Sequence, residues 1–572
     1  MKIIRRPPSA LLGLALAAAP LAAQERPAIS PAVRPFVAVD APVVALTHVR
    51  LVDGTGAPAR DDQTVIVSGA RIHAVGPSGS TAIPSGARVM DLAGHTVIPG
   101  LVSLHEHTYL GGLRRTVPMN ASAYLYLAFG VTTAMTAGSQ LAEQEVALKR
   151  AIDAGEMPGP RLHIAGPYIT AGTRRTGPFR GVDSPAEARR FVDEWAGKGA
   201  TWFKVMSGPR DVLRWTIDAA HARGLRVTGH LCAVTFAEAA EMGIDALQHG
   251  FITDSEHVPG KQRDQCPEGN QVAQADVDVA SPAVQASIRR IAARGTPVVS
   301  TLGVFESFVP GRARLDPRAM EMLAPEARRE VESTNAQLAV AAFNVPERLL
   351  TKMMRWERDF VDAGGLLGAG SDPWGTGFLP GFGNLRNYEL LVEAGFAPEQ
   401  AIGILTLNGA RILGEEERIG SIVAGKAADL VVIRGDPVAA PSQVYEVTLV
   451  FRGGVGYDSA RLREFGSDKC TTLAAALTYY AVLAIFPALL ALMSLIGTSK
   501  ARSSWAIQRP WREIAELPAT AVMINRTADV QLLGVQVDQP LDYRMALRLA
   551  RGQFTLEKAD FLALRAGFSR QI

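Results

Sequence analysis

Short apolar runs alternate with amphipathic helical stretches between residues 96 and 413. Apolar runs of this length, bounded by Gly, Pro and Asp, are typical of buried strands, and the stretches between them have the 3.6-residue period of helices. Eight such runs over about 300 residues predict a parallel βα repeat that closes into a (β/α)8 TIM barrel, an α/β fold. The runs are TVIPGLVSLH, GVTTAMTAG, RLHIAG, TWFKVM, LRVTGH, DALQHG, TPVVSTL and GLLGAGSD.

The segments on either side of this repeat have a different texture. Residues 43–95 contain short β-type runs separated by Gly, Pro, Asp and Ser, and residues 414–466 return to the same pattern. Strands before and after a barrel most simply pair with one another, so we expect one small composite β-sandwich. Residues 24–42 are rich in Pro and Ala without periodicity, which predicts a linker.

The N-terminus has the features of a secretory signal peptide over residues 1–23. A basic start, MKIIRR, precedes the apolar run ALLGLALAAA and a small-residue exit after Ala22 or Ala23. The run is short for a membrane span. An uncleaved anchor or a buried first helix is the alternative, and the Arg pair also permits a twin-arginine interpretation. We therefore expect an exported, periplasmic or extracytoplasmic protein.

An extra hydrophobic helix is predicted near the C-terminus, over residues 467–499. No residue between Lys469 and Lys500 is charged, and residues 471–497 are long and apolar enough to cross a bilayer. The basic residues beyond it favour a membrane tether over a fully buried core helix. Residues 500–572 are mixed and amphipathic and predict no function.

Composition removes several functional classes. The chain has 572 residues, 48% of them hydrophobic and 20% charged, which is globular. A net charge of +3 and the lack of a basic tract with interleaved aromatics argue against a nucleic-acid partner. Three cysteines are too few and too scattered to predict a disulfide framework or a cysteine-based zinc site.

Candidate metal ligands stand at the ends of the predicted barrel strands, where the active sites of such barrels lie. His105 and His107 are two apart on one strand, so their side chains point the same way and can share a metal. Lys204 ends another strand, and a lysine pointing into a core needs a modification or a partner. The remaining strand-end candidates are His230, His249 and Asp372.

This ordered set resembles the amidohydrolase superfamily in its binuclear form, over residues 43–465. The motifs VIPGLVSLHEH, GVTTAMTAG, LTLNGARILG and IGSIVAGKAADLVVIRGDP followed by GVGYD resemble the imidazolonepropionase-like and Xaa-Pro-dipeptidase-like (prolidase-like) branch. The resemblance implies two divalent ions, with zinc expected. They would be held by His105, His107 and Asp372 and by His230 and His249, and bridged by carbamylated Lys204. It also implies that Asp372 acts as general base and then general acid on a small-molecule or dipeptide-like substrate.

Other side chains near these positions have weaker claims. Glu106 points away from its neighbouring histidines if the strand is regular, which favours a structural role. His163 and Tyr109 are candidates for substrate contact, although solvated or structural roles are the commoner case. His221 lies in a helical stretch and is expected at the surface, and the loop after His249 either lines the pocket or is an irregular excursion.

Residues 471–497 resemble the opening helix of the YihY/BrkB-like inner-membrane family, without the further helices that such a family needs. Three functions therefore stay open. The first is a hydrolase that cleaves an amide, peptide or cyclic amide C–N bond. The second is a catalytically inactive metal-binding or sensor barrel, and the third is the extracytoplasmic module of a membrane-tethered protein. A homo-oligomer is also left open.

Overall fold

The computed structural model describes most of the chain between Arg26 and Glu464. The described residues are 26, 29–110, 117–118, 121–174, 177–269, 273–312, 316–323, 325–340, 345–373 and 377–464. The predicted signal peptide (1–23), membrane helix (467–499) and tail (500–572) lie outside them. Among the described residues, no helix is both long and apolar enough to cross a membrane.

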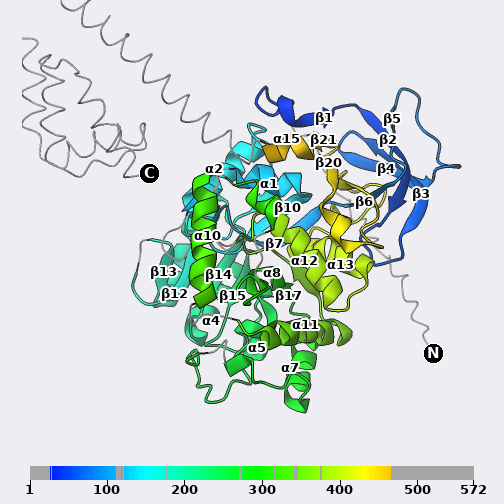
Figure 1. Ribbon diagram of the computed structural model, residues 1–572. Coiled ribbons are helices and arrows are strands. Elements are labelled where there is room, and N and C mark those ends of the chain that lie inside the picture. Colours follow the sequence, from blue (N-terminus) through cyan, green and yellow to red (C-terminus); the bar gives the residue numbers. More distant parts are fainter. Residues whose placement is uncertain are drawn as a thin grey trace, which may run out of the picture. The chain divides into compact units, whose positions relative to one another are not determined.

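Eight parallel strands form the predicted barrel, and each of the eight apolar runs contributes one (Figure 1). Hydrogen bonds order them as β11-β10-β7 and β14-β15-β16-β17-β18. Two further bonds close the ring, from Thr201 N to Ile164 O at 2.9 Å and from Asp372 N to His105 O at 2.8 Å. The strands are β7 Leu101–Glu106, β10 Val131–Thr136, β11 Arg161–His163, β14 Trp202–Met206, β15 Arg226–His230, β16 Ala246–Gln248, β17 Val298–Ser300 and β18 Leu367–Ala369.

Helices follow the strands and cover the barrel. Helix α3 shows why they begin and end where they do: the Ser184 hydroxyl accepts from Glu187 N, Pro185 stands at the first position, and Gly199 takes the left-handed conformation that ends the helix. The helices are α1 Ser122–Ala128, α2 Ala142–Asp153, α3 Pro185–Lys198, α4 Arg210–His221, α5 Phe236–Met242, α7 Pro282–Ala293, α8 Leu302–Glu306, α9 Pro317–Met320, α10 Pro325–Val340, α11 Glu347–Asp362, α12 Phe382–Glu393, α13 Pro398–Leu405, α14 Leu407–Leu413 and α15 Ser459–Glu464.

A β-bulge in β7 aims the first two histidines. Ser103 pairs with Ala134 and Glu106 with Thr136, so two residues of β7 oppose one residue of β10. The extra residue lets Leu104 pack in the apolar cluster with Met135 and Trp202, while the adjacent His105 also turns to polar partners inside the barrel.

The flanking segments join in one nine-stranded sheet, drawn mainly in blue and yellow in Figure 1. Its order is β1-β21-β20-β19-β6-β2-β3-β4, with β5 also paired to β2. The expected linker, residues 24–42, contains one of these strands. The strands are β1 Val37–Val39, β2 Val43–Leu51, β3 Arg60–Ser68, β4 Arg71–Pro77, β5 Arg88–Asp91, β6 His95–Pro99, β19 Leu430–Arg434, β20 Val447–Arg452 and β21 Val455–Asp458.

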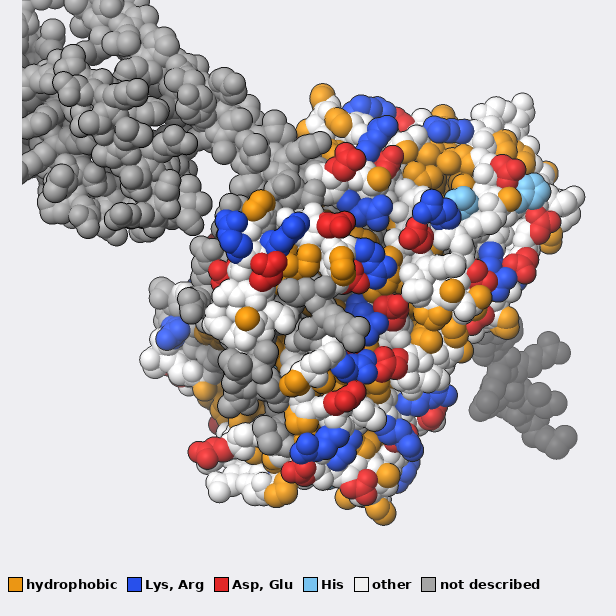
Figure 2. All heavy atoms as spheres, viewed as in Figure 1, with side chains coloured by type: hydrophobic (Ala, Val, Ile, Leu, Met, Phe, Trp, Pro, Cys, Tyr) orange, Lys and Arg blue, Asp and Glu red, His pale blue; other side chains and the backbone are white. Residues whose placement is uncertain are grey.

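Smaller elements complete the described chain. Strands β12 Tyr168–Ala171 and β13 Phe179–Val182 extend the barrel sheet beside β14, and β8 Tyr109–Leu110 pairs with β9 Val117–Pro118. Single turns of 3-10 helix lie at η1 Arg34–Phe36, η2 Gly250–Thr253 and η3 Pro441–Tyr445. Basic and acidic side chains are interspersed on the face shown in Figure 2, so charge there is compensated locally.

A buried ion pair fastens the nine-stranded sheet to the barrel. Arg161 at the start of β11 binds Asp429 through two hydrogen bonds, and the Asp429 side chain is only 3% exposed. Removing one partner of such a pair leaves the other charge buried and unpaired.

We expect Arg161→Met to lower the free energy of unfolding by about 3 kcal/mol, measured by urea denaturation. The matched control is Arg223→Met, because Arg223 pairs with Asp193 where the two side chains are 48% and 54% exposed. Exposed pairs contribute less than about 1 kcal/mol. Equal losses in the two variants would contradict the interpretation.

Candidate metal centre

The ends of β7, β14, β15, β16 and β18 converge on one buried cluster. Asp372 Oδ1 lies 3.1 Å from His107 Nε2 and 3.6 Å from His105 Nε2, and Asp372 Oδ2 lies 3.7 Å from His249 Nδ1. The His230 and His249 rings are 4.6 Å apart between centroids. The structure thus brings together His105, His107, Lys204, His230, His249 and Asp372, all six of the predicted ligands.

Lys204 is buried within this cluster. Its Nζ lies 3.0 Å from His105 Nε2 and 5.5 Å from the centroid of the Tyr168 ring. Burial lowers the pKa of Lys204 to about 8, although the Asp372 carboxylate opposes the shift. A substantial fraction of the amine is therefore neutral near pH 8, which is the form that reacts with carbon dioxide.

Burial holds His105, His230 and His249 in the neutral form that metals require, because it lowers the pKa of each imidazole. Burial lowers the pKa of His230 to about 4, and burial followed by the charge of Lys204 lowers that of His105 well below its ordinary value. The His105 Nδ1–H donates to Gln248 Oε1 at 2.7 Å, since an amide oxygen can only accept. The Nε2 lone pair of His105 consequently faces the cluster.

Two cluster residues have left-handed backbones. His249 has φ of 71° and Asp372 has φ of 48°, a conformation that residues other than glycine seldom adopt outside functional sites. Two residues before Asp372, the backbone lies close to that of β7. A Cβ on Gly370 would lie 2.3 Å from His105 N, so only glycine lets β18 lie this near to β7.

Glu106 joins the two strand ends from behind, as its predicted orientation implies. Its Oε1 accepts from Ser371 N at 3.0 Å and from Asn384 Nδ2 at 2.8 Å, and its Oε2 accepts from the Ser371 hydroxyl at 2.5 Å. Burial raises the pKa of Glu106, although Ser103 and these hydrogen bonds oppose the shift. Glu106 lies in sequence between His105 and His107. Its carboxylate thus holds Ser371, the residue before Asp372.

Tyr109 and Tyr168 form one wall of the cluster. The Tyr109 ring stacks on His107 with centroids 4.9 Å apart, and its hydroxyl lies 2.9 Å from that of Tyr168. Tyr109 was a candidate for substrate contact, and the structure places it against a candidate ligand. Sequence reasoning missed Tyr168, because β12 falls outside the eight runs of the barrel pattern.

The structure does not bring His163 to this cluster. His163 pairs in register with Met135, a residue of the apolar barrel interior, and its Nε2 lies 3.3 Å from Glu415 Oε1 beyond α14. His163 is level with this apolar residue and not with the candidate ligands, so its side chain pairs with Glu415 instead. His221 is 41% exposed and pairs with Asp245, as expected for a surface position.

One expectation about cysteine needs correction. Cys232 and Cys266 form a disulfide across 34 residues of sequence. The spacing gave no sign of it, because the loop after His249 folds back onto the end of β15 and brings the two cysteines together.

The donor set fits a divalent metal. Ligand atoms of His105, His249 and Asp372 all lie within 4.8 Å of one another. His107 Nδ1 is buried without a hydrogen-bond partner among the described residues, which an imidazole fixed by a metal through its other nitrogen can tolerate. Neutral imidazoles with a carboxylate are the ligands of zinc and similar ions.

Comparisons with known proteins agree with the fold. A model of the amidohydrolase family matches residues 96–456, and a model of the virulence factor BrkB family matches residues 461–542, which confirms both predicted resemblances. The chain is 41% identical to an imidazolonepropionase of Pseudomonas syringae pv. tomato over 54 residues, which cover 9% of this chain and 14% of that protein.

Two solved structures share the fold over most of the described chain. One is a Xaa-Pro dipeptidase with methionine bound in its active site, with a TM-score of 0.54 and 21% identity, covering 73% of this chain and 100% of that one. The other is phenylurea hydrolase B, with a TM-score of 0.53 and 22% identity, covering 73% and 97%. At these identities the likeness establishes the fold.

We expect the metal-free protein to lose stability as the pH falls from 6.5 to 4. Unfolded His230 takes up a proton near its ordinary pKa of 6.5, whereas the folded side chain does so only near 4, so acid favours unfolding throughout this window. Urea denaturation after metal removal should show a decrease on the order of 1–3 kcal/mol. His230→Asn should flatten the profile. An unchanged slope in that variant would contradict the assignment.

Proposed function

Because the chain belongs to the amidohydrolase family, we propose that it is a metal-dependent hydrolase that cleaves a C–N bond. The observation that carries the proposal is the convergence of six ligand-type side chains from five strand ends. His105, His107 and Asp372 would hold one ion, and His230 and His249 a second. Divalent ions bound there would lower the pKa of a water molecule and polarise the scissile carbonyl.

Lys204 would bridge the two ions as a carbamate. Its neutral amine would attack carbon dioxide, which forms an N–C bond and releases one proton. A carbamate, which carries a carboxylate, would then stand in place of the buried amine. The pKa of about 8 supports this step, because burial already disfavours the cationic amine. The carbamate would replace an amine that is partly protonated, so Lys204 would no longer carry a positive charge beside His105.

Asp372 would move the proton. Its carboxylate, within 3.1 Å of His107, would accept a proton from the attacking water and then give that proton to the nitrogen of the leaving amine. Of the cluster's side chains it is the only carboxylate, and its side chain is 15% exposed. It can therefore meet both the water and the leaving group.

A dipeptide or an N-acyl amino acid is the proposed substrate class. The shared fold of the Xaa-Pro dipeptidase and the short imidazolonepropionase match support an amide or a cyclic amide. An inactive sensor barrel is the weaker alternative, because a binder does not need a proton-carrying carboxylate among its ligands.

We further propose that the protein is exported and tethered by its C-terminal part. The signal-like N-terminus, the disulfide and the BrkB family match support this location. Disulfides persist mainly in oxidising compartments outside the cytoplasm.

Elemental analysis of the purified chain should find two divalent ions per chain, with zinc expected, and a screen of dipeptides and N-acyl amino acids should find metal-dependent hydrolysis. Fewer than one ion per chain, with no activity after zinc and bicarbonate are supplied, would exclude the binuclear centre.

Lys204→Ala should lose about 100-fold in kcat, the upper end of the range found when a group that supports a metal site is removed. Short carboxylic acids should restore part of it, because they can occupy the place of the carbamate. The matched control is Lys198→Ala, since Lys198 pairs with Glu194 at the surface. It should keep full activity and gain nothing from the acids, and no rescue of Lys204→Ala would argue against the carbamate.

Deleting residues 467–572 should move the protein from the membrane fraction to the soluble fraction with its activity intact. Retention of the truncated protein in the membrane fraction would contradict the tether, and loss of activity would assign the C-terminal part more than a tethering role.

A further inference from the structure

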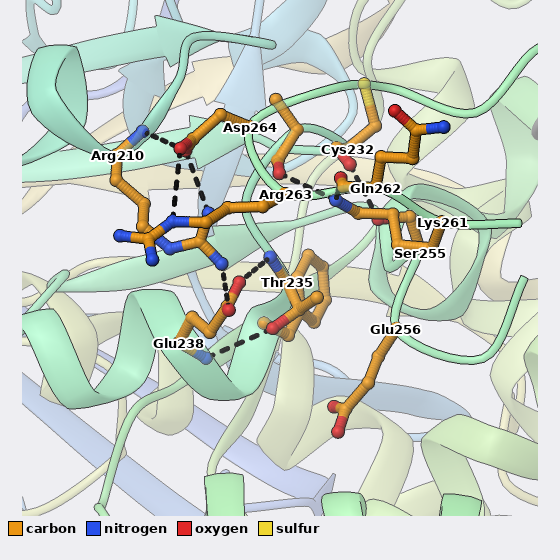
Figure 3. A network of polar contacts seen from close by, with 12 residues as sticks. Arg210, Cys232, Thr235, Glu238, Ser255, Glu256, Lys261, Gln262, Arg263 and Asp264 are labelled. Atoms are coloured by element: carbon orange, nitrogen blue, oxygen red, sulfur yellow. Dashed lines mark hydrogen bonds and ion pairs between the residues drawn. The ribbon is translucent and has the colours of Figure 1, made fainter.

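Covalent and polar contacts connect three chain segments that leave the metal end of the barrel (Figure 3). They follow β14, β15 and β16, the strands that lead to Lys204, His230 and His249. The Cys232–Cys266 disulfide joins the second segment to the third. We call these covalent and polar links between residues 207–210, 232–238 and 254–266 the clasp.

Ion pairs and hydrogen bonds complete the clasp. Asp264 accepts from Arg210 N and Arg210 Nη1, each at 2.9 Å, so the third segment is tied to the first. Arg210 also pairs with Glu238 of the second segment. Lys261 Nζ donates to Ala233 O at 2.9 Å.

The clasp reaches the backbone of His230 directly. Ser207 N donates to His230 O at 2.8 Å. The Ser207 hydroxyl lies 3.3 Å from Cys232 Sγ and must be the donor, because a disulfide sulfur carries no proton. One residue thus touches both the end of β15 and the disulfide.

His230 depends on this backbone support more than His105 and His249 do. The His105 ring is fixed by Gln248, and the His249 Nδ1 lies 2.9 Å from Thr301 Oγ1. Among the described residues, no hydrogen bond fixes the His230 ring. Its position is therefore set by where β15 ends.

The opposite half of the cluster has separate support. Glu106, Ser371 and Asn384 connect the strands of His105, His107 and Asp372. In the part of the chain that the structure describes, this network and the clasp share no residue.

We propose that the clasp, with the Cys232–Cys266 disulfide at its centre, is the positioning device for His230 and hence for the second of the two ions. The inference rests on the proposed binuclear function. The two ions then have separate supports. The disulfide raises the affinity for the ion at His230 and His249 and leaves the affinity for the other ion unchanged.

The test titrates zinc into the metal-free full-length chain with a chromogenic chelator as competitor, for the wild type and for a Cys232→Ser/Cys266→Ser double variant. The variant should bind the ion held by His230 and His249 about 10- to 100-fold less tightly, the range known for residues that orient metal ligands. Its affinity for the ion held by His105, His107 and Asp372 should stay within about threefold of wild type. His230→Asn shows what selective loss of the second ion looks like, and Glu106→Gln should weaken the ion held by His105, His107 and Asp372.

Cys470→Ser is the matched control, because it removes a cysteine and leaves the disulfide. It should titrate as the wild type does. Should the double variant fail to fold, Asp264→Asn breaks the ion pair with Arg210 and keeps the disulfide. It should weaken the same ion in the same direction.

Equal weakening of both ions, or weakening of neither, would overturn the inference and leave the hydrolase proposal standing. A wild-type chain that binds fewer than two ions would overturn the inference together with the binuclear centre on which it rests, and this is visible before any variant is compared. Loss of the second ion alone in the double variant, with Cys470→Ser unchanged, is the expected result.

Discussion

The hydrogen bond from Asp372 N to His105 O, at 2.8 Å, closes the barrel and assembles its chemistry in one step. Residues separated by most of the barrel sequence become neighbours through it, because the last strand meets the first only when the ring is complete. Gly370 makes the approach sterically possible, and the left-handed Asp372 backbone then turns the carboxylate toward the histidines. A barrel that failed to close would contain the same side chains, but they would not lie together as a cluster.

Closure alone does not position six ligands, and the structure adds two separate supports. Glu106 stands behind the first strand and binds the residue before Asp372. The clasp stands beyond β14, β15 and β16 and binds the end of β15 through Ser207 and Cys232. One support is a buried carboxylate and the other is a covalent link, so they respond to different changes in sequence and conditions.

The eight strands and the convergence of the six candidate ligands could be predicted from the sequence, because apolar runs and strand-end positions are local features. The bulge in β7 could not, since it depends on the register with β10. The disulfide and the place of Tyr168 depend on how a loop and an added strand fold back, which no short window of sequence contains. His163 shows the opposite error. A strand-end position suggested the site, but His163 is level with the apolar residue Met135 and its side chain contacts Glu415 instead.

Burying the bases of the cluster costs free energy of folding, and a bound ion would offset this cost. Burial holds His105, His230 and His249 neutral and lowers the pKa of Lys204 to about 8, so the metal-free fold bears the cost of desolvating four bases. Ligands that are already deprotonated need not release protons when a metal binds, which strengthens binding near neutral pH. The arrangement that destabilises the empty barrel in acid is therefore the one that favours a filled centre at neutral pH, and metal binding and folding become one coupled equilibrium.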